Sequence, residues 1–125
     1  MNLERLKHDH KDILNHCHEI RKEIVRKAPP KRLQKIAAEI YEQHLKSHFE
    51  YEEKHVFPLL GNDHPIIIQA IKEHQQIAAI CKMNDYSLML AKQLMSEMDA
   101  HFQFEERVVF PYIQQTVTEE QLLKI

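Results

Sequence analysis

The stretch HFEYEEKHVFPLL, residues 48–60, returns later in the chain as HFQFEERVVFPYI, residues 101–113. Each copy places a histidine four residues before the first glutamate of a pair. On a helix, two side chains at this spacing are neighbours on one face. The repeat therefore predicts two helices that present the same histidine and glutamate side chains.

The composition favours an all-α protein with one domain over residues 1–125. The 125 residues fit one ordinary domain, and one glycine and five prolines leave few turn residues for β-hairpins. A net charge of −2 gives no electrostatic signature of nucleic-acid binding. The apolar stretches are too short to span a membrane, so we expect neither nucleic acid nor a membrane as partner.

Apolar residues at helical spacing predict five helices, over roughly residues 3–27, 31–60, 65–85, 88–115 and 118–125. Asn2 is the expected cap of the first helix, Pro65 suits the first turn of the third, and Thr118 with Gln121 forms a capping box for the last. The fourth apolar stripe contains Leu88, Ala91, Leu94, Met98, Val108 and Tyr112. Long amphipathic helices joined by short turns predict an antiparallel up-and-down four-helix bundle with a short C-terminal helix.

Polar residues interrupt each of the four long apolar stripes, and we expect them to point inward. They are His10, His48, Glu52, His74, His101 and Glu105.

Their positions along the chain also predict that the four histidines lie at one height in the bundle. In an antiparallel hairpin, two residues at equal height are equidistant from the turn. His10 and His48 are centred on Pro29, His48 and His74 on Gly61, and His74 and His101 beside Ser87, and each centre is an expected break between helices.

Four imidazoles and two carboxylates in an apolar core require compensation, because an unpaired buried polar group costs about 1 to 3 kcal/mol. Six protein ligands are too many for one tetrahedral zinc ion. Two metal ions bridged by Glu52 and Glu105, with two histidines each, account for the whole set. Mixed imidazole and carboxylate ligands suit iron first, with manganese or zinc as alternatives.

Other polar residues near the stripes leave alternatives open. Glu106 is the substitute for Glu105 as a ligand, while His44 and His55 fall near the second stripe and fit core filling or a hydrogen bond to a ligand. Glu52 and His55 form an ExxH pair, as in ferritin-like di-iron proteins. Those proteins need the pair on two helices, and the fourth helix has Val108 instead.

The paired HxxxEExxxFP motifs, together with LKHDHKDI and AIKEHQQI on the first and third helices, resemble the hemerythrin-like (HHE cation-binding) domain family. The resemblance covers nearly the whole chain. It implies a four-helix bundle with a carboxylate-bridged non-haem di-iron centre, whose ligands match the six residues above. Family functions include dioxygen binding, oxygen, redox or iron sensing, and protection or repair under oxidative and nitrosative stress.

Two features depart from oxygen-carrying hemerythrins, and the first of them brings the chain closer to the repair-of-iron-centres type. Ala78 replaces a second histidine on the third helix, and the i+5 carboxylate spacing of the hemerythrin fourth helix would here select Glu106. The missing imidazole leaves a coordination position for dioxygen, nitric oxide or peroxide. We therefore expect an oxygen or redox sensor or a stress protein, with turnover of nitric oxide or peroxide, or repair of damaged iron–sulfur centres, as the enzymatic alternative.

Two further features concern the setting and partners of the protein. Cys17 and Cys81 lie outside any CxxC motif, and the first residues do not resemble a signal peptide, so we expect buried thiols and a cytoplasmic, reducing compartment. The basic run from Arg21 to Lys35 surrounds the expected turn between the first two helices. An anionic partner at this turn is one interpretation, and a solvated bundle end is the plainer one.

Overall fold

The computed structural model describes residues 3–125, and all regular secondary structure within this range is helical, as predicted. The first long segment is α1 (Leu3–Val25), and the third is α4 (Pro65–Cys81). The second segment runs without a break through α2 (Pro30–Ile40), η1 (Tyr41–Leu45), α3 (Lys46–Tyr51), η2 (Glu52–Val56) and η3 (Phe57–Leu59). The fourth runs through α5 (Leu88–Phe104), η4 (Glu105–Val109) and α6 (Phe110–Thr116), and α7 (Glu119–Leu123) follows it.

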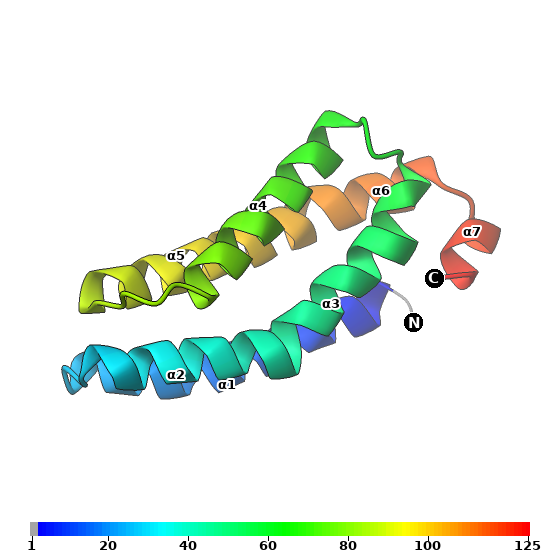
Figure 1. Ribbon diagram of the computed structural model, residues 1–125. Coiled ribbons are helices and arrows are strands. Elements are labelled where there is room, and N and C mark those ends of the chain that lie inside the picture. Colours follow the sequence, from blue (N-terminus) through cyan, green and yellow to red (C-terminus); the bar gives the residue numbers. More distant parts are fainter. Residues whose placement is uncertain (1–2) are drawn as a thin grey trace.

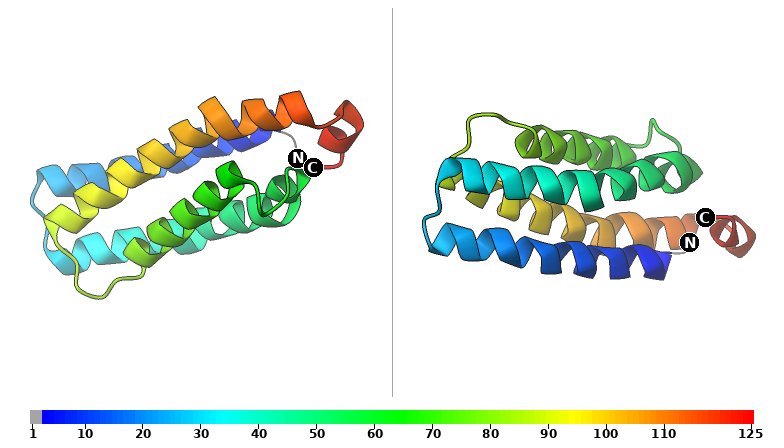
Figure 2. Two further views of the ribbon diagram at one scale, coloured as in Figure 1. Left: turned by 90° about the horizontal axis from the view of Figure 1, so that it is seen from above. Right: turned by 60° about the horizontal axis from the view of Figure 1, so that its bottom comes forward.

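The four long segments lie side by side, with their turns gathered at two ends (Figures 1 and 2). Residues 26–29 and residues 82–87 turn at one end. The turn at residues 60–64 lies at the other end, where α1 begins and α7 folds back. Consecutive segments are therefore connected by short turns at alternating ends.

Side-chain caps mark the starts of α4, α5 and α7. The Ser87 hydroxyl accepts a hydrogen bond from the Leu90 N–H at 3.0 Å, and the capping box of Thr118 and Gln121 is present as predicted. Pro65 occupies the first turn of α4, also as predicted, and the ring of His64 caps this helix by accepting from the Ile66 N–H at 3.2 Å. The third helix ends at Cys81 and not near residue 85. Asn2, the expected cap of α1, lies outside the described residues.

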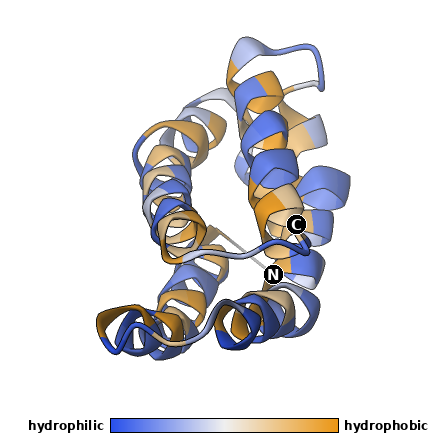
Figure 3. Ribbon diagram, turned by 60° about the vertical axis from the view of Figure 1, so that its left-hand side comes forward, coloured by the Kyte–Doolittle hydropathy of each residue, from blue (hydrophilic) through white to orange (hydrophobic). Residues whose placement is uncertain are grey.

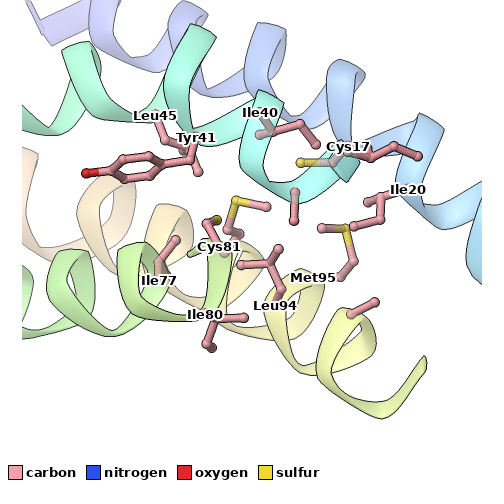
Figure 4. Packing of buried hydrophobic residues seen from close by; sticks show 14 of the residues in the cluster. Cys17, Ile20, Ile40, Tyr41, Leu45, Ile77, Ile80, Cys81, Leu94 and Met95 are labelled. Atoms are coloured by element: carbon pink, nitrogen blue, oxygen red, sulfur yellow. The ribbon is translucent and has the colours of Figure 1, made fainter. Parts of the chain in front are cut away.

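Apolar residues recur along all four segments (Figure 3), and the buried ones form two clusters. The larger cluster fills the end near the turns at 26–29 and 82–87, and Figure 4 shows Cys17, Ile40, Cys81 and Leu94 among its side chains. The smaller cluster fills the other end and includes Leu6, Phe57 and Phe110. Both cysteines are fully buried, as predicted.

Three π-helical turns, η1, η2 and η4, interrupt the second and fourth segments. A π turn adds one residue, which rotates the following side chains by about 100° relative to a continuous α-helix. The predicted positions of Val108 and Tyr112 in the core are wrong for this reason. They are 40% and 39% exposed, and Val109 and Ile113 take their places in the core.

Across residues 3–125, the helices all fall short of the length and apolar character needed to cross a membrane.

Candidate metal centre

A polar layer separates the two apolar clusters, and every one of the six predicted ligands lies in it. On α1, His10 follows Leu6 of the smaller cluster and precedes Ile13 of the larger one. The other segments contribute their polar residues at the same boundary between the clusters. These buried residues are His10, His48, Glu52, His74, His101 and Glu105.

Each buried glutamate lies between histidines from two different segments. Oε1 of Glu52 is 3.3 Å from Nε2 of His48 and 3.3 Å from Nε2 of His74. Oε1 of Glu105 is 3.0 Å from Nε2 of His101 and 3.3 Å from Nε2 of His10. The i+4 spacing of the repeated motif therefore gives each glutamate one histidine from its own segment and one from a neighbouring segment.

The inward-facing atoms form two overlapping sets of potential metal ligands. Within each set, one atom from every residue lies within 4.8 Å of the others. Glu52 and Glu105 belong to both sets. The first set adds His10 and His48, and the second adds His74 and His101. This arrangement suits two cations that share both carboxylates.

The hydrogen bonding of the layer also fits bound cations. Both carboxylate oxygens of Glu52 and Glu105, and Nε2 of His74 and of His101, are buried without a hydrogen bond within the described chain. Leaving such atoms unpaired in an apolar interior is costly. These are the donor atoms that a transition-metal ion takes, so the residues present fit a metal centre.

The outward-facing Nδ1 atoms of the same histidines face a second group of acids, here called the outer carboxylates. Nδ1 lies 3.0 Å from Glu106 in His10, 2.7 Å from Glu53 in His74 and 2.7 Å from Glu73 in His101. For His48 the partner is Asp9, at the longer distance of 3.7 Å. A carboxylate on the outer nitrogen fixes the ring and its tautomer and leaves the other nitrogen free to bind a metal.

The outer carboxylates follow a cyclic order around the layer. Asp9 of α1 serves the second segment, Glu53 of the second serves α4, Glu73 of α4 serves α5, and Glu106 of the fourth serves α1. Each of these acids is adjacent in sequence to one of the six buried residues. This explains the paired glutamates: the first of each pair points into the layer and the second supports a histidine of another segment.

The phenylalanines of the two motifs pack on His74 and His10, the two histidines of the layer that lie outside the motifs. Phe49 and Phe57 lie nearly parallel to the ring of His74, with centroids 3.9 and 5.4 Å away. Phe102 and Phe110 lie in the same way over His10, at 4.2 and 5.8 Å. The aromatic rings cover these imidazoles with apolar surface and limit their rotation.

The buried charges of the layer influence one another strongly. Burial and the negative charge of Glu105 raise the pKa of Glu52 well above its usual range. Burial opposes ionisation of Glu105 as well, but His101 and His10 hold its pKa well below the usual range. Burial would lower the pKa of His101, yet Glu105 and Glu73 raise it to about 9.

At His48 the surroundings lower the pKa, in contrast to His101. Burial and the positive charge of His10 lower the pKa of His48 to about 3. His48 is therefore neutral near pH 7, the form in which an imidazole binds a metal.

The alternative ligands lie outside the layer. Glu106 is not within either set of inward-facing atoms, because its carboxylate contacts the outer nitrogen of His10. His55 is exposed and packs on Tyr51, and His44 is half-buried and stacks on His16. The sequence did not lead us to predict the contacts of Asp9 and Glu73 with histidines of other segments. A usable signal was present, because Asp9 directly precedes His10 and Glu73 directly precedes His74.

An all-helical protein with a buried layer of histidines and glutamates falls in the class of helical proteins whose interior side chains could hold metal ions. Within this class, the family model of the hemerythrin HHE cation binding domain matches residues 1–89, and the chain belongs to this family. The match includes His10, His48, Glu52 and His74, while His101 and Glu105 follow it. No curated protein and no solved structure matched the chain.

Proposed function

We propose that this protein binds two iron ions, one in each of the overlapping ligand sets, with Glu52 and Glu105 shared between them. The observation that carries this proposal is the division of the layer into two sets with the same bridging pair. Membership of a cation-binding family supports it independently. Imidazole and carboxylate ligands favour iron, and manganese and zinc are the competing metals.

We infer that the scaffold of this centre is an antiparallel up-and-down four-helix bundle. The alternating ends of the turns support this arrangement. It also accounts for the common height of the four histidines, each of which comes from a different segment.

We propose that the centre keeps an open coordination position for dioxygen, nitric oxide or peroxide, and that the protein acts in oxygen or redox sensing or in stress protection. Each ligand set contains two histidines and two carboxylates, fewer ligands than iron commonly takes when the carboxylates bridge. Ala78, one turn after His74, supplies no further imidazole. Ala78 in place of a further histidine also supports a relationship to the repair-of-iron-centres type.

Metal analysis of anaerobically purified protein, with optical spectra before and after air and nitric oxide, tests this proposal. We expect about two irons per chain, from the two ligand sets, and a spectrum that changes with each gas. A single tetrahedral zinc ion, or no retained metal, would contradict the proposal. Catalytic consumption of nitric oxide or peroxide that is lost in His101→Ala would favour the enzymatic alternative over binding and sensing.

The setting and partners of the protein are also proposals. Two free, buried cysteines support a reducing cytoplasmic compartment. At the basic turn, Arg21, Arg26 and Arg32 form ion pairs with acids of the chain, which lowers the charge available to an anionic partner. We keep this partner as the weaker candidate, and unchanged partner binding after Lys31→Glu would remove it.

A further inference from the structure

A cavity of about 360 Å³ opens between α1 and the second segment and reaches one side of the metal centre. Asp9 and His48 line its inner part, and Asp12, His44 and Ser47 also line it. The imidazole of His48 is itself one of the buried ligands. The cavity therefore connects the protein surface with a histidine of the centre.

The centre is least tightly closed on this side. The outer nitrogens of His10, His74 and His101 form hydrogen-bond contacts of 2.7 to 3.0 Å with their carboxylates. Nδ1 of His48 has no hydrogen-bond partner in the described chain and lies 3.7 Å from Asp9. Asp9 also faces Arg5 at 3.6 Å, so its carboxylate is shared between the surface and the centre.

Side chains of metal-binding types lie near the outer part of the cavity: Asp12 and His44 line it, and His16 lines an adjoining cavity of about 170 Å³. The imidazoles of His16 on α1 and His44 on η1 stack with a centroid distance of 3.9 Å. Asp12 lies one turn before His16 and shares the cavity lining with His44. Burial and the positive charge of His16 lower the pKa of His44, which favours the neutral, metal-binding imidazole.

The backbone at His44 is also unusual. His44 lies in η1, a π-helical turn that contains none of the six buried ligands, whereas η2 and η4 each begin at a bridging glutamate. π turns occur frequently at functional sites in helices. This turn directs a histidine toward α1, where it meets His16.

A second cavity, of about 120 Å³, reaches His101 from the opposite pair of helices, α4 and α5. Glu73 and Glu97 line it, and Glu73 closes its inner side through the 2.7 Å contact with His101. It is smaller and has no histidine at its surface, so it is the weaker route to the centre.

We propose that the cavity between α1 and the second segment is the entrance by which divalent metal ions reach the centre. At the mouth, Asp12 and His44 bind the ion transiently, with His16 stacked against His44 beside them, and Asp9 passes it to His48. Imidazole and carboxylate side chains select the same transition metals as the inner ligands, and an exposed pair binds them more weakly than a buried set of four. This inference rests on the proposed metal-binding function, because an entrance has meaning only if the centre takes up metal.

The test uses Co²⁺ as the probe, added to the metal-stripped full chain, with the visible absorption of bound Co²⁺ followed by stopped flow. The main variant is His16→Gln/His44→Gln, and the matched control is His18→Gln, an exposed histidine of α1 that does not line the cavity. We expect the double variant to load the centre several-fold more slowly, with the same final stoichiometry as the parent. With excess Co²⁺, a weak additional site in the parent should be absent from the double variant. Asp12→Asn should slow loading in the same direction, and Glu97→Gln and the control should load at the parent rate.

Equal loading rates in the double variant and the parent would overturn the entrance while leaving metal binding intact. A lower final stoichiometry in the double variant would assign His16 and His44 to the centre itself and would also overturn it. Slower loading in Glu97→Gln alone would place the entrance between α4 and α5. A parent protein that binds no Co²⁺ would overturn the entrance and the proposed function together, so the two failures are distinguishable.

Discussion

Oε2 of Glu106 lies 3.0 Å from Nδ1 of His10, while Oε1 of its neighbour Glu105 lies 3.3 Å from Nε2 of the same ring. Adjacent glutamates thus contact opposite nitrogens of one imidazole. This relationship separates the two roles that the paired glutamates leave open in the sequence. One carboxylate is placed to bind a metal, and the other is placed to hold the histidine.

Glu105→Gln and Glu106→Gln form a matched pair that tests this separation. We expect Glu105→Gln to disturb both metal positions, because Glu105 belongs to both ligand sets. Glu106→Gln should keep the stoichiometry but weaken one of the two positions by about 10- to 100-fold, as loss of an outer partner typically does. Metal titration followed by optical absorption measures both. Equal losses in the two variants would contradict the division of roles.

Phe49 and Phe102 should affect the two metal positions separately. Phe49 stacks on His74 at 3.9 Å and Phe102 stacks on His10 at 4.2 Å. Replacement by leucine removes the ring contact, at a cost of about 1 kcal/mol, and frees one imidazole. In a two-step Co²⁺ titration, we expect Phe49→Leu to weaken the position that contains His74, and Phe102→Leu the one that contains His10. Identical titration curves for the two variants would contradict the expectation that each phenylalanine supports a different metal position.

Removal of metal should destabilise the protein. The oxygens of Glu52 and Glu105 have no hydrogen bonds within residues 3–125, so a bound cation compensates these buried ligand atoms, and it does so only in the folded state. At free metal about 100-fold above Kd, each site contributes about 2.7 kcal/mol. Thermal unfolding with and without a chelator measures this. In His101→Ala, the difference in Tm with and without the chelator should be much smaller. A parent Tm that is the same with and without the chelator would refute the expectation.

The buried thiols should make stability fall at high pH. Burial raises the pKa of both Cys17 and Cys81 from the usual range of a thiol to about 12. The folded chain therefore keeps both protons while the unfolded chain begins to lose them near pH 9. The stabilising contribution is complete below about pH 9 and is lost as pH rises toward 12. Urea unfolding between pH 8 and 10.5 measures the decline.

Cys17→Ala/Cys81→Ala is the control for this pH dependence. Replacement of the thiols costs stability at every pH, because it opens space in the larger apolar cluster. It should nevertheless flatten the slope of stability against pH above about 9. An unchanged slope would assign the alkaline loss to other groups. In the folded parent, iodoacetamide at pH 8 should modify neither thiol, which mass spectrometry detects.

The sequence by itself determined the all-α class and the six buried residues, because both depend on periodicity. An apolar stripe with a 3.6-residue repeat identifies the inward face of a helix, and a histidine or glutamate on that stripe has to be buried. The equal distances of His10 and His48 from Pro29 further predicted a common height. These inferences needed only the length of each helix and the position of each turn.

Only the tertiary structure decided how those residues are used. The exchange of Val108 for Val109 in the core follows from the π turn η4, which the α-helical repeat does not reveal. The choice between Glu105 and Glu106 depends on which side of His10 each carboxylate reaches. The cyclic order of the outer carboxylates and the cavity beside His48 depend likewise on contacts between residues far apart in the chain, and such contacts leave no periodic signal in the sequence.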